Sequence, residues 1–310
     1  MPETVPERYL CVLNPAAGRG SAARRWPEVE RLLSAHALNF ELIVSEPHTL
    51  GRTLAYLRSL PKDTAVVAVG GDGTTHSLLG AVVGTGRPLG LVPLGRGNDL
   101  AAALGWTGGL EDAVARLSCP PAPLDVLHVQ FSGEERFCLN GLGMGFDALV
   151  TVRAAGSPKA LGGFGGYALG ALLAVRDFRM GRLELTLDGQ PFFAGESFLC
   201  AVMNSTRYGG GFQISPRSSP ADALADVLVG RRVSRAALLP LMLRVLRGRH
   251  LGHPKVVHAQ ATHLSLRWAE ATPLHLDGDL YGLVDALEVA LLPRAVLLLG
   301  APAAVAPVPV

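Results

Sequence analysis

The sequence has little charge, few aromatic residues and no apolar run long enough to cross a membrane. Of its 310 residues, 17% are charged and 6% are aromatic, whereas 49% are hydrophobic. This balance predicts a globular protein with a large core and argues against disorder. No stretch approaches the ~20 apolar residues of a membrane-spanning helix, and the N-terminal residues MPETVPERYLCVLN lack the pattern of a signal peptide. We expect no transmembrane segment and a cytoplasmic protein that is at most peripheral at the inner face of the membrane.

Cysteine is also scarce, and the cysteines are not spaced as metal ligands. Cys11, Cys119, Cys138 and Cys200 lie far apart with no CxxC pair, so we expect a reduced protein without a structural zinc site. The histidines show no HExxH or other ligand spacing. The formal net charge is only +2, and the excess of arginine over lysine accompanies abundant alanine, leucine and glycine. We attribute the excess of arginine to the nucleotide composition of the coding sequence and expect no nucleic-acid partner. Whether the protein forms a homodimer is left open by the sequence.

The hydrophobic pattern divides the chain into two parts, which its length also favours. In the first part, apolar runs alternate with segments of helical spacing, which is typical of a doubly wound parallel α/β domain. The expected strands are residues 9–14, 40–44, 64–69 and 89–92, and the expected helices are residues 21–35, 49–60 (with Thr49 as N-cap) and 74–83, then short helices near Asp99 and Glu111. We expect this domain to cover residues 1–122 and to end at a proline-rich break, residues 120–123.

Beyond residue 123 the hydrophobic period changes to two, which predicts antiparallel β-strands. Leu183, Leu185 and Leu187 alternate with polar residues, and Asp188-Gly189 is a strong hairpin signal. The same alternation returns at residues 264–268 and 274–276, and residues 295–299 are expected to form a last buried strand. Residues 167–175 and 235–246 are expected to form helices, and residues 162–166 (GGFGG) a flexible loop. We expect a mostly antiparallel β domain over residues 123–293.

Residues 70–74, GGDGT, directly follow the expected strand at residues 64–69. Ligands bind at the carboxyl ends of parallel strands, where glycines let backbone N–H groups approach a phosphate beside a helix N-terminus. The carboxylate of Asp72 would repel a phosphate directly. Its position makes sense if it binds Mg²⁺, accepts a proton from a nucleophile or orients a donor.

Two further glycine loops follow neighbouring strands, NPAAGRG at residues 14–20 and PLGRGND at residues 93–99. Each loop alone is compatible with an ordinary turn, but three such loops at one sheet edge predict a nucleotide site. The sequence contains no P-loop motif. Residues 18–23 match the dinucleotide fingerprint GxGxxA, with Glu41 downstream, but these glycines lie several residues after the strand, so we disfavour an oxidoreductase.

In this combination the sequence resembles the diacylglycerol kinase catalytic-domain family, which includes bacterial lipid kinases and sphingosine kinases. The matching motifs run in order along nearly the whole chain: NPAAGRG, GGDGT, PLGRGNDLA, residues 204–216 (NSTRYGGGFQISP) and residues 276–279 (LDGD). The resemblance implies a nucleotide-binding α/β domain, a C-terminal antiparallel β-sandwich that binds lipid, an active site in the cleft between them, and a segment, residues 294–310, that returns to the first domain. It implies a kinase that uses ATP and Mg²⁺ to phosphorylate a lipid hydroxyl, such as that of diacylglycerol, at a membrane surface.

The resemblance also assigns functional residues. Those that would bind ATP are Asn14, Arg19, Gly71, Gly73, Thr74, Gly97, Asn98 and Asp279. The carboxylates assigned to Mg²⁺ are Asp99 and Asp222, and Asp72 and Asp277 are the candidates for the base that takes the proton of the lipid hydroxyl. We favour Asp277, because a carboxylate of the lipid-binding domain meets the hydroxyl from the lipid side, whereas Asp72 lies among phosphate-binding glycines.

Four positions depart from the family's usual pattern. Ser77, Arg96, Ala223 and Asp279 stand where glutamate, a small hydroxyl residue, glycine and glutamate are usual. These departures bear on lipid choice and Mg²⁺ geometry, and they leave open a catalytically weak or inactive nucleotide- or lipid-binding protein. A sphingoid-base kinase and an NAD kinase-like enzyme, which shares a GGDG-type loop, also stay open. The motifs at residues 204–216 and 276–279 fit the lipid kinases better than the NAD kinases.

Arginines surround the apolar residues 236–246. They are Arg231, Arg232, Arg235, Arg244, Arg247 and Arg249. This composition suits a helix that rests on anionic lipid. A helix packed on its own domain with solvated arginines would have the same composition, and Pro240 within the run slightly favours that packed helix.

Overall fold

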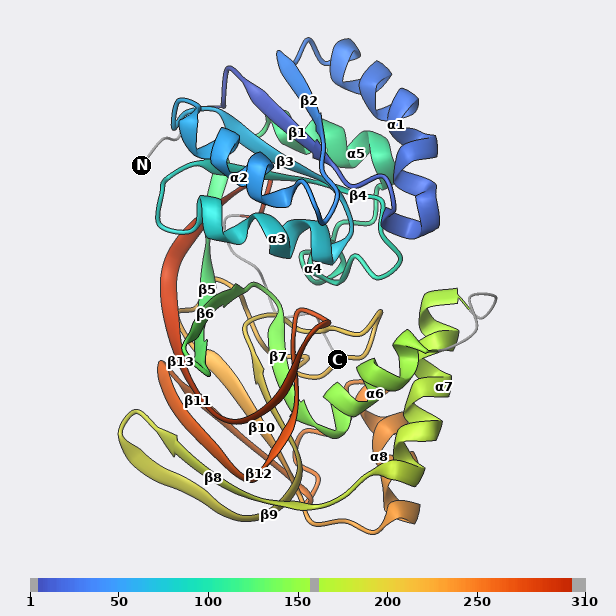
Figure 1. Ribbon diagram of the computed structural model, residues 1–310, viewed down its shortest axis with the longest axis vertical. Coiled ribbons are helices and arrows are strands. Elements are labelled where there is room, and N and C mark those ends of the chain that lie inside the picture. The colour runs from blue at the N-terminus through green and yellow to red at the C-terminus, as the bar shows by residue number, and fades with distance from the viewer. Residues whose placement is uncertain (1–4, 157–161, 303–310) are drawn as a thin grey trace. The chain divides into compact units, whose positions relative to one another are not determined.

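The computed structural model describes residues 5–156 and 162–302, which form two compact units (Figure 1). Unit 1 contains residues 5–126 and 293–302, and unit 2 contains the described residues between 127 and 292. Each unit has its own hydrophobic core. Residues 303–310 of the segment expected to return to the first domain lie outside the described residues.

Unit 1 is an α/β fold with a parallel sheet. Its strands are β1 (Tyr9–Leu13), β2 (Phe40–Val44), β3 (Ala65–Gly70) and β4 (Pro88–Pro93), and its helices are α1 (Ala17–Ala35), α2 (Leu50–Ser59), α3 (Asp72–Val82), α4 (Asp99–Ala103) and α5 (Gly109–Ala115), followed by a 3₁₀ turn (Arg116–Ser118). The end of a late strand, β13 (Asp279–Leu299), pairs with β4, so the order is β13-β4-β3-β1-β2 with every pair parallel. Strands that are buried throughout, such as AVVAVG in β3, are typical of a parallel sheet covered on both faces.

Helices cover both faces of this sheet (Figure 1). On one face, Val29 of α1 and Val114 of α5 share a core with Cys11 and Val67 of the strands. On the other face, α3 contacts β3 and β4 and also packs against α2. The doubly wound α/β architecture expected from the sequence is confirmed.

Two local expectations in unit 1 differ from the structure. The proline-rich residues 120–123 are not a break, because Pro121 begins β5 (Pro121–Phe131), which pairs with β13 and with β6 (Glu134–Cys138). Proline is tolerated at the first residue of a strand, where its missing N–H leaves no ladder bond unmade. Thr49 precedes α2 as predicted, but its hydroxyl does not cap the helix and instead accepts the N–H of Glu46 at 2.9 Å.

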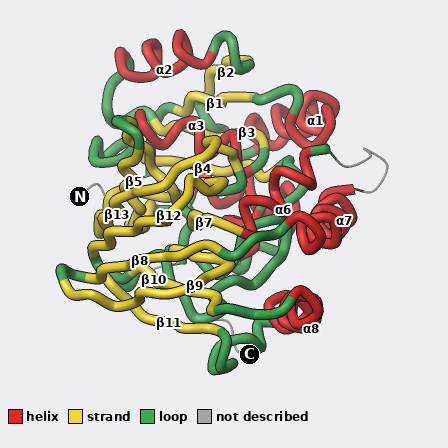
Figure 2. Tube along the Cα trace, turned by 60° about the horizontal axis from the view of Figure 1, so that its bottom comes forward, coloured by secondary structure: helices red, strands yellow, loops and turns green. Residues whose placement is uncertain are grey.

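Unit 2 combines antiparallel strands with helices that lie at one side of them (Figure 2). The remaining strands are β7 (Gly141–Gly145), β8 (Gly181–Leu187), β9 (Gln190–Met203), β10 (Ala225–Arg231), β11 (Val256–Ala261) and β12 (His263–Leu276), and the helices are α6 (Phe146–Ala155), α7 (Gly162–Asp177) and α8 (Arg235–Leu246). β9 and β12 each pair with both β7 and β8, so these four strands close on themselves. The antiparallel β fold expected for the second half of the chain is confirmed.

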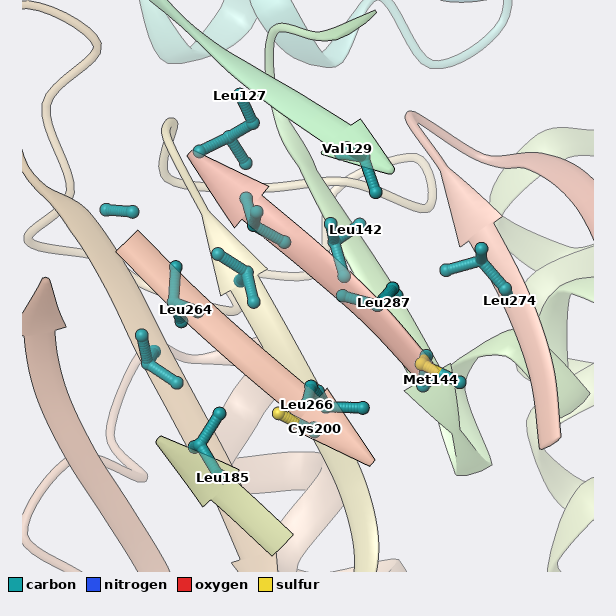
Figure 3. Packing of buried hydrophobic residues seen from close by; sticks show 14 of the residues in the cluster. Leu127, Val129, Leu142, Met144, Leu185, Cys200, Leu264, Leu266, Leu274 and Leu287 are labelled. Atoms are coloured by element: carbon teal, nitrogen blue, oxygen red, sulfur yellow. The ribbon is translucent and has the colours of Figure 1, made fainter. Parts of the chain in front are cut away.

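The main core of unit 2 lies between these strands (Figure 3). Alternate residues of β8 and β12 point into it, and Leu185, Leu264 and Leu266 are at most 2% exposed. The period of two in the sequence therefore marks the inner face of each strand. Met144 of β7 and Cys200 of β9 fill the same core.

Two-residue turns join strands where Asp-Gly pairs occur in the sequence. Asp188 and Gly189 have φ values of 47° and 78° between β8 and β9, and Asp277 and Gly278 have φ values of 51° and 92° between β12 and β13. Positive φ at both central positions is the geometry that these residues favour in hairpins. The turn after β12 fixes the place of Asp277, one of the two candidate bases.

The helices of unit 2 correct one further expectation. The predicted loop at residues 162–166 is wrong, because these residues begin α7. α7 packs closely along α6, where a Cβ on Gly170 would lie 2.7 Å from the backbone N of Ala154, so tertiary packing supports a helix whose first residues have low helix propensity. α8 runs through Pro240 without a break, and the hydroxyl of Ser234 accepts the N–H of Ala237 at its start. Across the described residues, no helix is long and apolar enough to span a membrane.

Candidate active site

The three glycine loops of unit 1 meet at one edge of its sheet. β1, β3 and β4 are parallel and adjacent with β3 in the middle, so their carboxyl ends lie side by side. Leu94 N donates to Gly70 O at 2.7 Å, and Asn14 N donates to Val69 O at 3.1 Å. These bonds tie the first and third loops to the GGDGT loop between them.

Glycine is required where the loops touch. A Cβ on Gly18, whose φ is 59°, would lie 2.4 Å from Leu94 O. A Cβ on Gly95 would lie 2.4 Å from the Cα of Gly71. Because no side chain fits at either contact, the loops present backbone groups to the space at the sheet edge. Backbone N–H groups beside the N-terminus of α3 form an arrangement that suits a phosphate.

Asp72 and Thr74 lie in the first turn of α3. The Oδ1 atom of Asp72 accepts the N–H of Leu100 at 3.2 Å, which links the GGDGT loop to the start of α4. Thr74 Oγ1 is buried and has no hydrogen-bond partner within residues 5–156 and 162–302. It packs under Gly70, where a Cβ would lie 2.2 Å from it. Gly73, between these residues, is exposed. The Thr74 hydroxyl therefore points back to β3, whereas Gly73 presents its backbone to solvent.

Asn14 and Arg19 shape the first loop. The side chain of Asn14 accepts the N–H of Ala16 at 3.1 Å, and this Asx turn leads the chain into α1. Residues 18–20 all have positive φ, and Arg19 itself has φ of 61°. The side chains of Arg19 and of Arg96, in the third loop, are exposed. Guanidinium groups at this edge suit the binding of phosphate oxygens.

Asn98 organises the third loop from a left-handed conformation, with φ of 51°. Its Nδ2 atom donates to Gly95 O at 3.2 Å, whereas its Oδ1 atom is buried, faces Gly71 and has no hydrogen-bond partner among the described residues. A small hollow lies between the second and third loops here. An unsatisfied buried acceptor beside this hollow fits a donor supplied by a ligand. Gly97 is exposed, and Asp99 is only 5% exposed.

In unit 2, four donors hold the carboxylate of Asp277. Its Oδ1 atom accepts the N–H groups of Asn140 at 2.8 Å and Gly141 at 3.1 Å, and the thiol of Cys138 at 3.0 Å. Its Oδ2 atom accepts the N–H of Leu139 at 2.9 Å. Burial, and then the charge of Asp277, raise the pKa of the Cys138 thiol well above its usual value. The thiol therefore stays protonated as a donor, and the Asp277 carboxylate is fixed in orientation.

The residues assigned to Mg²⁺ lie in different units. Asp99 is in unit 1, whereas Asp222 is an exposed residue of unit 2 whose Oδ1 atom accepts the N–H of Leu224 at 3.1 Å. No three His, Cys, Asp or Glu side chains are grouped as a metal site within residues 5–156 and 162–302. Mg²⁺ commonly takes only one or two carboxylates together with substrate phosphates and water. The carboxylates of Asp72 and Asp99 therefore fit an ion that arrives with a nucleotide.

The departures from the family's pattern have local structural consequences. Ser77 donates its hydroxyl to Thr74 O at 2.8 Å within α3. Ala223 has φ of 61°, a conformation that glycine adopts with less strain. Asp279 is exposed at the first position of β13.

An apolar cavity in unit 2 was not predicted from the sequence. It measures about 820 Å³, including its open mouth, and aliphatic and aromatic side chains of α6, α7, α8, β9 and β10 make most of its lining. Asp147, at the start of α6, brings a carboxylate to this lining. The surface that the cavity exposes is almost wholly apolar, as a site for acyl chains requires, and the Asp147 carboxylate is bound by neighbouring side chains.

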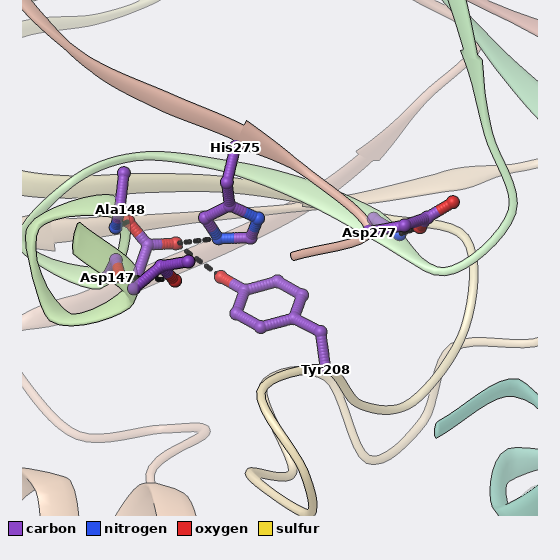
Figure 4. Close-up of polar contacts among 7 residues, drawn as sticks. Asp147, Ala148, Tyr208, His275 and Asp277 are labelled. Carbon is purple, nitrogen blue, oxygen red and sulfur yellow. Dashed lines mark hydrogen bonds and ion pairs between the residues drawn. The ribbon is translucent and has the colours of Figure 1, made fainter. Parts of the chain in front are cut away.

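Tyr208 and His275 bind the carboxylate of Asp147, and we call these three residues the polar cluster (Figure 4). The Tyr208 hydroxyl donates to Oδ2, and His275 Nε2 lies 3.3 Å from the same oxygen. A Cβ on Gly143 of β7 would lie 1.6 Å from this oxygen, so glycine makes room for the cluster. Burial, and then Asp147, raise the pKa of Tyr208 well above its usual value, so the phenol stays a donor. Figure 4 shows Asp277 beyond the ring of His275.

The cluster comes from three distant parts of the sequence, which explains why no local pattern indicated it. Tyr208 belongs to the motif at residues 204–216, and His275 is the polar residue between Leu274 and Leu276 at the end of β12. The one available signal was an acidic residue directly after an apolar strand, which Asp147 shares with Asp72.

Comparisons with known proteins agree with this architecture. Residues 8–129 match the family model described as a diacylglycerol kinase catalytic domain, and residues 141–300 match the one described as a YegS C-terminal NAD kinase beta sandwich-like domain. A diacylglycerol kinase of Mycobacterium tuberculosis is 28% identical over 278 residues, with 88% of each chain covered. A protein of Chromohalobacter salexigens named "Probable lipid kinase YegS-like" is 31% identical over 221 residues, with 69% of each chain covered.

Solved structures show the same fold. A crystal structure of a diacylglycerol kinase from Bacillus anthracis aligns with a TM-score of 0.72 at 19% identity, covering 97% of this chain and 99% of that one. An NAD kinase of Archaeoglobus fulgidus aligns with a TM-score of 0.51 at 13% identity, covering 95% of this chain and 94% of that one. The chain belongs to the diacylglycerol kinase catalytic-domain family, with a YegS-type C-terminal domain, and the resemblance noted in the sequence is confirmed. Its relatives support a lipid kinase, and thus a phosphotransferase, as the class of enzyme.

Proposed function

We propose that the protein is an ATP-dependent lipid kinase that transfers the γ-phosphate of ATP to the hydroxyl of a lipid such as diacylglycerol. Membership of a kinase family and the three glycine loops support the nucleotide part of this proposal. The apolar cavity of unit 2 is the observation that carries the lipid part. A space lined mostly by aliphatic and aromatic side chains suits acyl chains and is a poor site for a second nucleotide.

Unit 1 would bind and orient the nucleotide. The backbone of Gly71 and Gly73 and the guanidinium groups of Arg19 and Arg96 bind the phosphates in this proposal, and Asn98 Oδ1 accepts a ligand donor. Asn14 and Thr74 act through the loops that they shape. The residues that would hold Mg²⁺ are Asp72 and Asp99, where the ion would neutralise charge on the phosphates.

Unit 2 would supply the base and the acceptor site. The proton of the lipid hydroxyl passes to the Asp277 carboxylate while the hydroxyl oxygen bonds to the γ-phosphorus, and the bond between that phosphorus and the β-γ bridging oxygen breaks to release ADP. The donors around Asp277 hold its carboxylate in one orientation, so no rearrangement is needed at the moment of proton transfer. Asp279 and Asp222 are exposed on the same unit and contribute to nucleotide and ion binding in this proposal.

The test is ADP release from ATP and Mg²⁺ with and without vesicles that contain diacylglycerol. We expect release to require the lipid and the lipid to gain phosphate by mass spectrometry. Met242→Trp, at the cavity wall, should slow the reaction of long-chain diacylglycerol more than that of a short-chain analogue, because it shortens the space for acyl chains. Val152→Trp is the matched control, since Val152 is 39% exposed on the neighbouring helix.

Two results would contradict the proposal, and a third would change only its substrate. ADP release that is independent of lipid would remove the lipid acceptor, and phosphorylation of NAD in its place would indicate an NAD kinase-like enzyme. ATP binding without turnover on any lipid of a total extract would indicate an inactive binding protein. A sphingoid base that gains phosphate where diacylglycerol does not would keep the reaction and change the substrate.

A further inference from the structure

Helices α7 and α8 expose leucines to solvent instead of burying them. Leu172 and Leu173 of α7 are 56% and 40% exposed, and Leu239 and Leu243 of α8 are 42% and 54% exposed. Leu239 and Leu243 lie four residues apart, so they share one face of α8. The two helices contact each other, and Figure 1 shows α7 running beside α8. We call these four residues the leucine face.

Arginines without acidic partners lie at the C-terminal end of α8. Arg244, Arg247 and Arg249 are exposed, and none of them forms an ion pair with any residue that the structure describes. The sequence of α8, RAALLPLMLRVL, contains no acidic residue. Two of the other arginines considered in the sequence are engaged, because Arg232 pairs with Glu196 at 2.9 Å and Arg235 donates to the backbone at 3.4 Å. A local excess of positive charge therefore borders the leucine face.

The opposite side of α8 lines the apolar cavity. Leu238, Leu241, Met242 and Val245 belong to its lining, and Ala171 of α7 does so beside the exposed Leu172. One pair of helices thus forms the cavity wall with its inner side and the leucine face with its outer side.

We propose that the leucine face and Arg244, Arg247 and Arg249 form the surface by which the protein docks on an anionic bilayer. The leucines enter the boundary between headgroups and acyl chains, and the guanidinium groups bind lipid phosphates around them. Charge complementarity favours an anionic bilayer as the partner, because helices that bind at membrane interfaces combine exposed apolar side chains with flanking arginines. The docking surface gives the proposed kinase access to a water-insoluble acceptor, so its role rests on the proposed function. Its binding to vesicles can be measured without any kinase activity.

Co-sedimentation with vesicles tests the surface without any turnover. The parent should bind vesicles of phosphatidylcholine with phosphatidylglycerol and bind phosphatidylcholine alone weakly, and high salt should reduce binding. The triple substitution Arg244→Gln, Arg247→Gln and Arg249→Gln should weaken binding by about 100-fold, since each arginine near an anionic surface contributes about 1 kcal/mol. The control replaces Arg31, Arg52 and Arg58, which are exposed on α1 and α2, with glutamine and so removes the same charge elsewhere.

A second variant separates the apolar part of the surface from the charged part. Leu239→Gln with Leu243→Gln should weaken binding at both low and high salt by about tenfold or more, because burial of a leucine in the interface does not depend on salt. Equal loss of binding in the control and test triple variants would overturn the proposal by showing a general charge effect. A parent that ignores vesicles and forms a dimer which the leucine substitutions dissociate would overturn it in favour of self-association. If vesicle binding fails while detergent-dispersed lipid is still phosphorylated, the docking surface is wrong and the proposed function stands.

Discussion

Gly71 and Gly95, in the loops after β3 and β4, face each other with too little room for a Cβ on either residue. A Cβ on Gly95 would lie 2.4 Å from the Cα of Gly71, and a Cβ on Gly71 would lie 3.0 Å from the Cα of Gly95. Both obstacles are backbone atoms, which cannot rotate away. The distance between the second and third loops is therefore set by the absence of two side chains.

Gly95→Ala should push these loops apart and weaken ATP binding by about tenfold or more, because small displacements at a binding site are costly. The measurement is calorimetric titration of ATP into the folded variant. Gly80→Ala in α3 is the control, since nothing lies within 4 Å of a Cβ there. It should stabilise the protein by about 0.5–1 kcal/mol and leave the affinity unchanged. Normal ATP affinity of a folded Gly95→Ala variant would place the nucleotide elsewhere.

Asp277→Asn and Asp72→Asn should have different effects on rate and binding. Asp277→Asn should lower turnover by ~10²–10⁴-fold with nearly normal Mg²⁺-ATP affinity, because it removes a base and not a phosphate contact. It should also lower stability by about 1–3 kcal/mol, since an amide NH₂ group cannot accept the bonds that the carboxylate accepts. Asp72→Asn should lower Mg²⁺-ATP affinity as well as rate. The reverse pattern, with a dead Asp72→Asn that binds normally and a normally active Asp277→Asn, would exchange the two roles.

Arg87 stabilises unit 1 without belonging to the candidate site. It is 3% exposed and donates to the backbone carbonyls of Leu60, Pro61 and Thr64 at 2.8–2.9 Å. Lysine cannot reach all three acceptors in this fork, so Arg87→Lys should lower the free energy of unfolding by about 2–4 kcal/mol in urea denaturation. The exposed Arg52 of α2 provides the comparison, and Arg52→Lys should stay within about 0.5 kcal/mol of the parent. Similar losses in both variants would mean that the buried fork contributes nothing.

His250, in the lining of the apolar cavity, should make stability depend on pH. It is 2% exposed, and burial lowers its pKa below the usual 6.5, while its bond to Ile214 O acts in the opposite direction. The unfolded chain therefore binds this proton more readily than the folded protein does. The stability that the neutral imidazole contributes is complete above pH ~6.5 and is lost as the pH falls below that value.

Thermal unfolding between about pH 7.5 and pH 5.5 measures this effect. The melting temperature of the parent should fall more steeply towards acid than that of His250→Gln, whose amide can donate to the same carbonyl without titrating. Parallel curves for the two proteins would show that His250 binds its proton equally in both states.

The sequence predicted that the three glycine loops meet at one edge of the sheet, because the determinants of that arrangement are local. Each loop is a short glycine-bearing segment after an apolar run, and parallel strands necessarily bring such segments to one edge. The orientation of each side chain in these loops cannot be predicted from such local patterns. Thr74 was expected to face the phosphates, but its hydroxyl is buried under Gly70. That difference depends on the rotamer of one residue in the first turn of α3.

The cavity and the polar cluster could not be predicted from local patterns. Asp147, Tyr208 and His275 are brought together by strand pairing between β7, β9 and β12, which no local pattern specifies. The start of α7 was misjudged for a related reason, because the close approach of α6 outweighs the helix propensity of glycine. Tertiary contacts determine both the position of these polar residues and the start of α7, and such contacts cannot be inferred from the periodicity of the sequence.

The strand β13 begins beside Asp277 in unit 2 and ends in unit 1, where Leu297 and Leu298 pair with Pro88 and Leu89 of β4. During translation, the first four strands of unit 1 leave the ribosome long before this fifth strand is made. Until residues 293–299 emerge, β4 has an open edge that is able to pair with other chains. A chain shortened before residue 293 should therefore aggregate through the unpaired edge of β4, so the last strand of this sheet protects an edge of the first domain from contact with other chains.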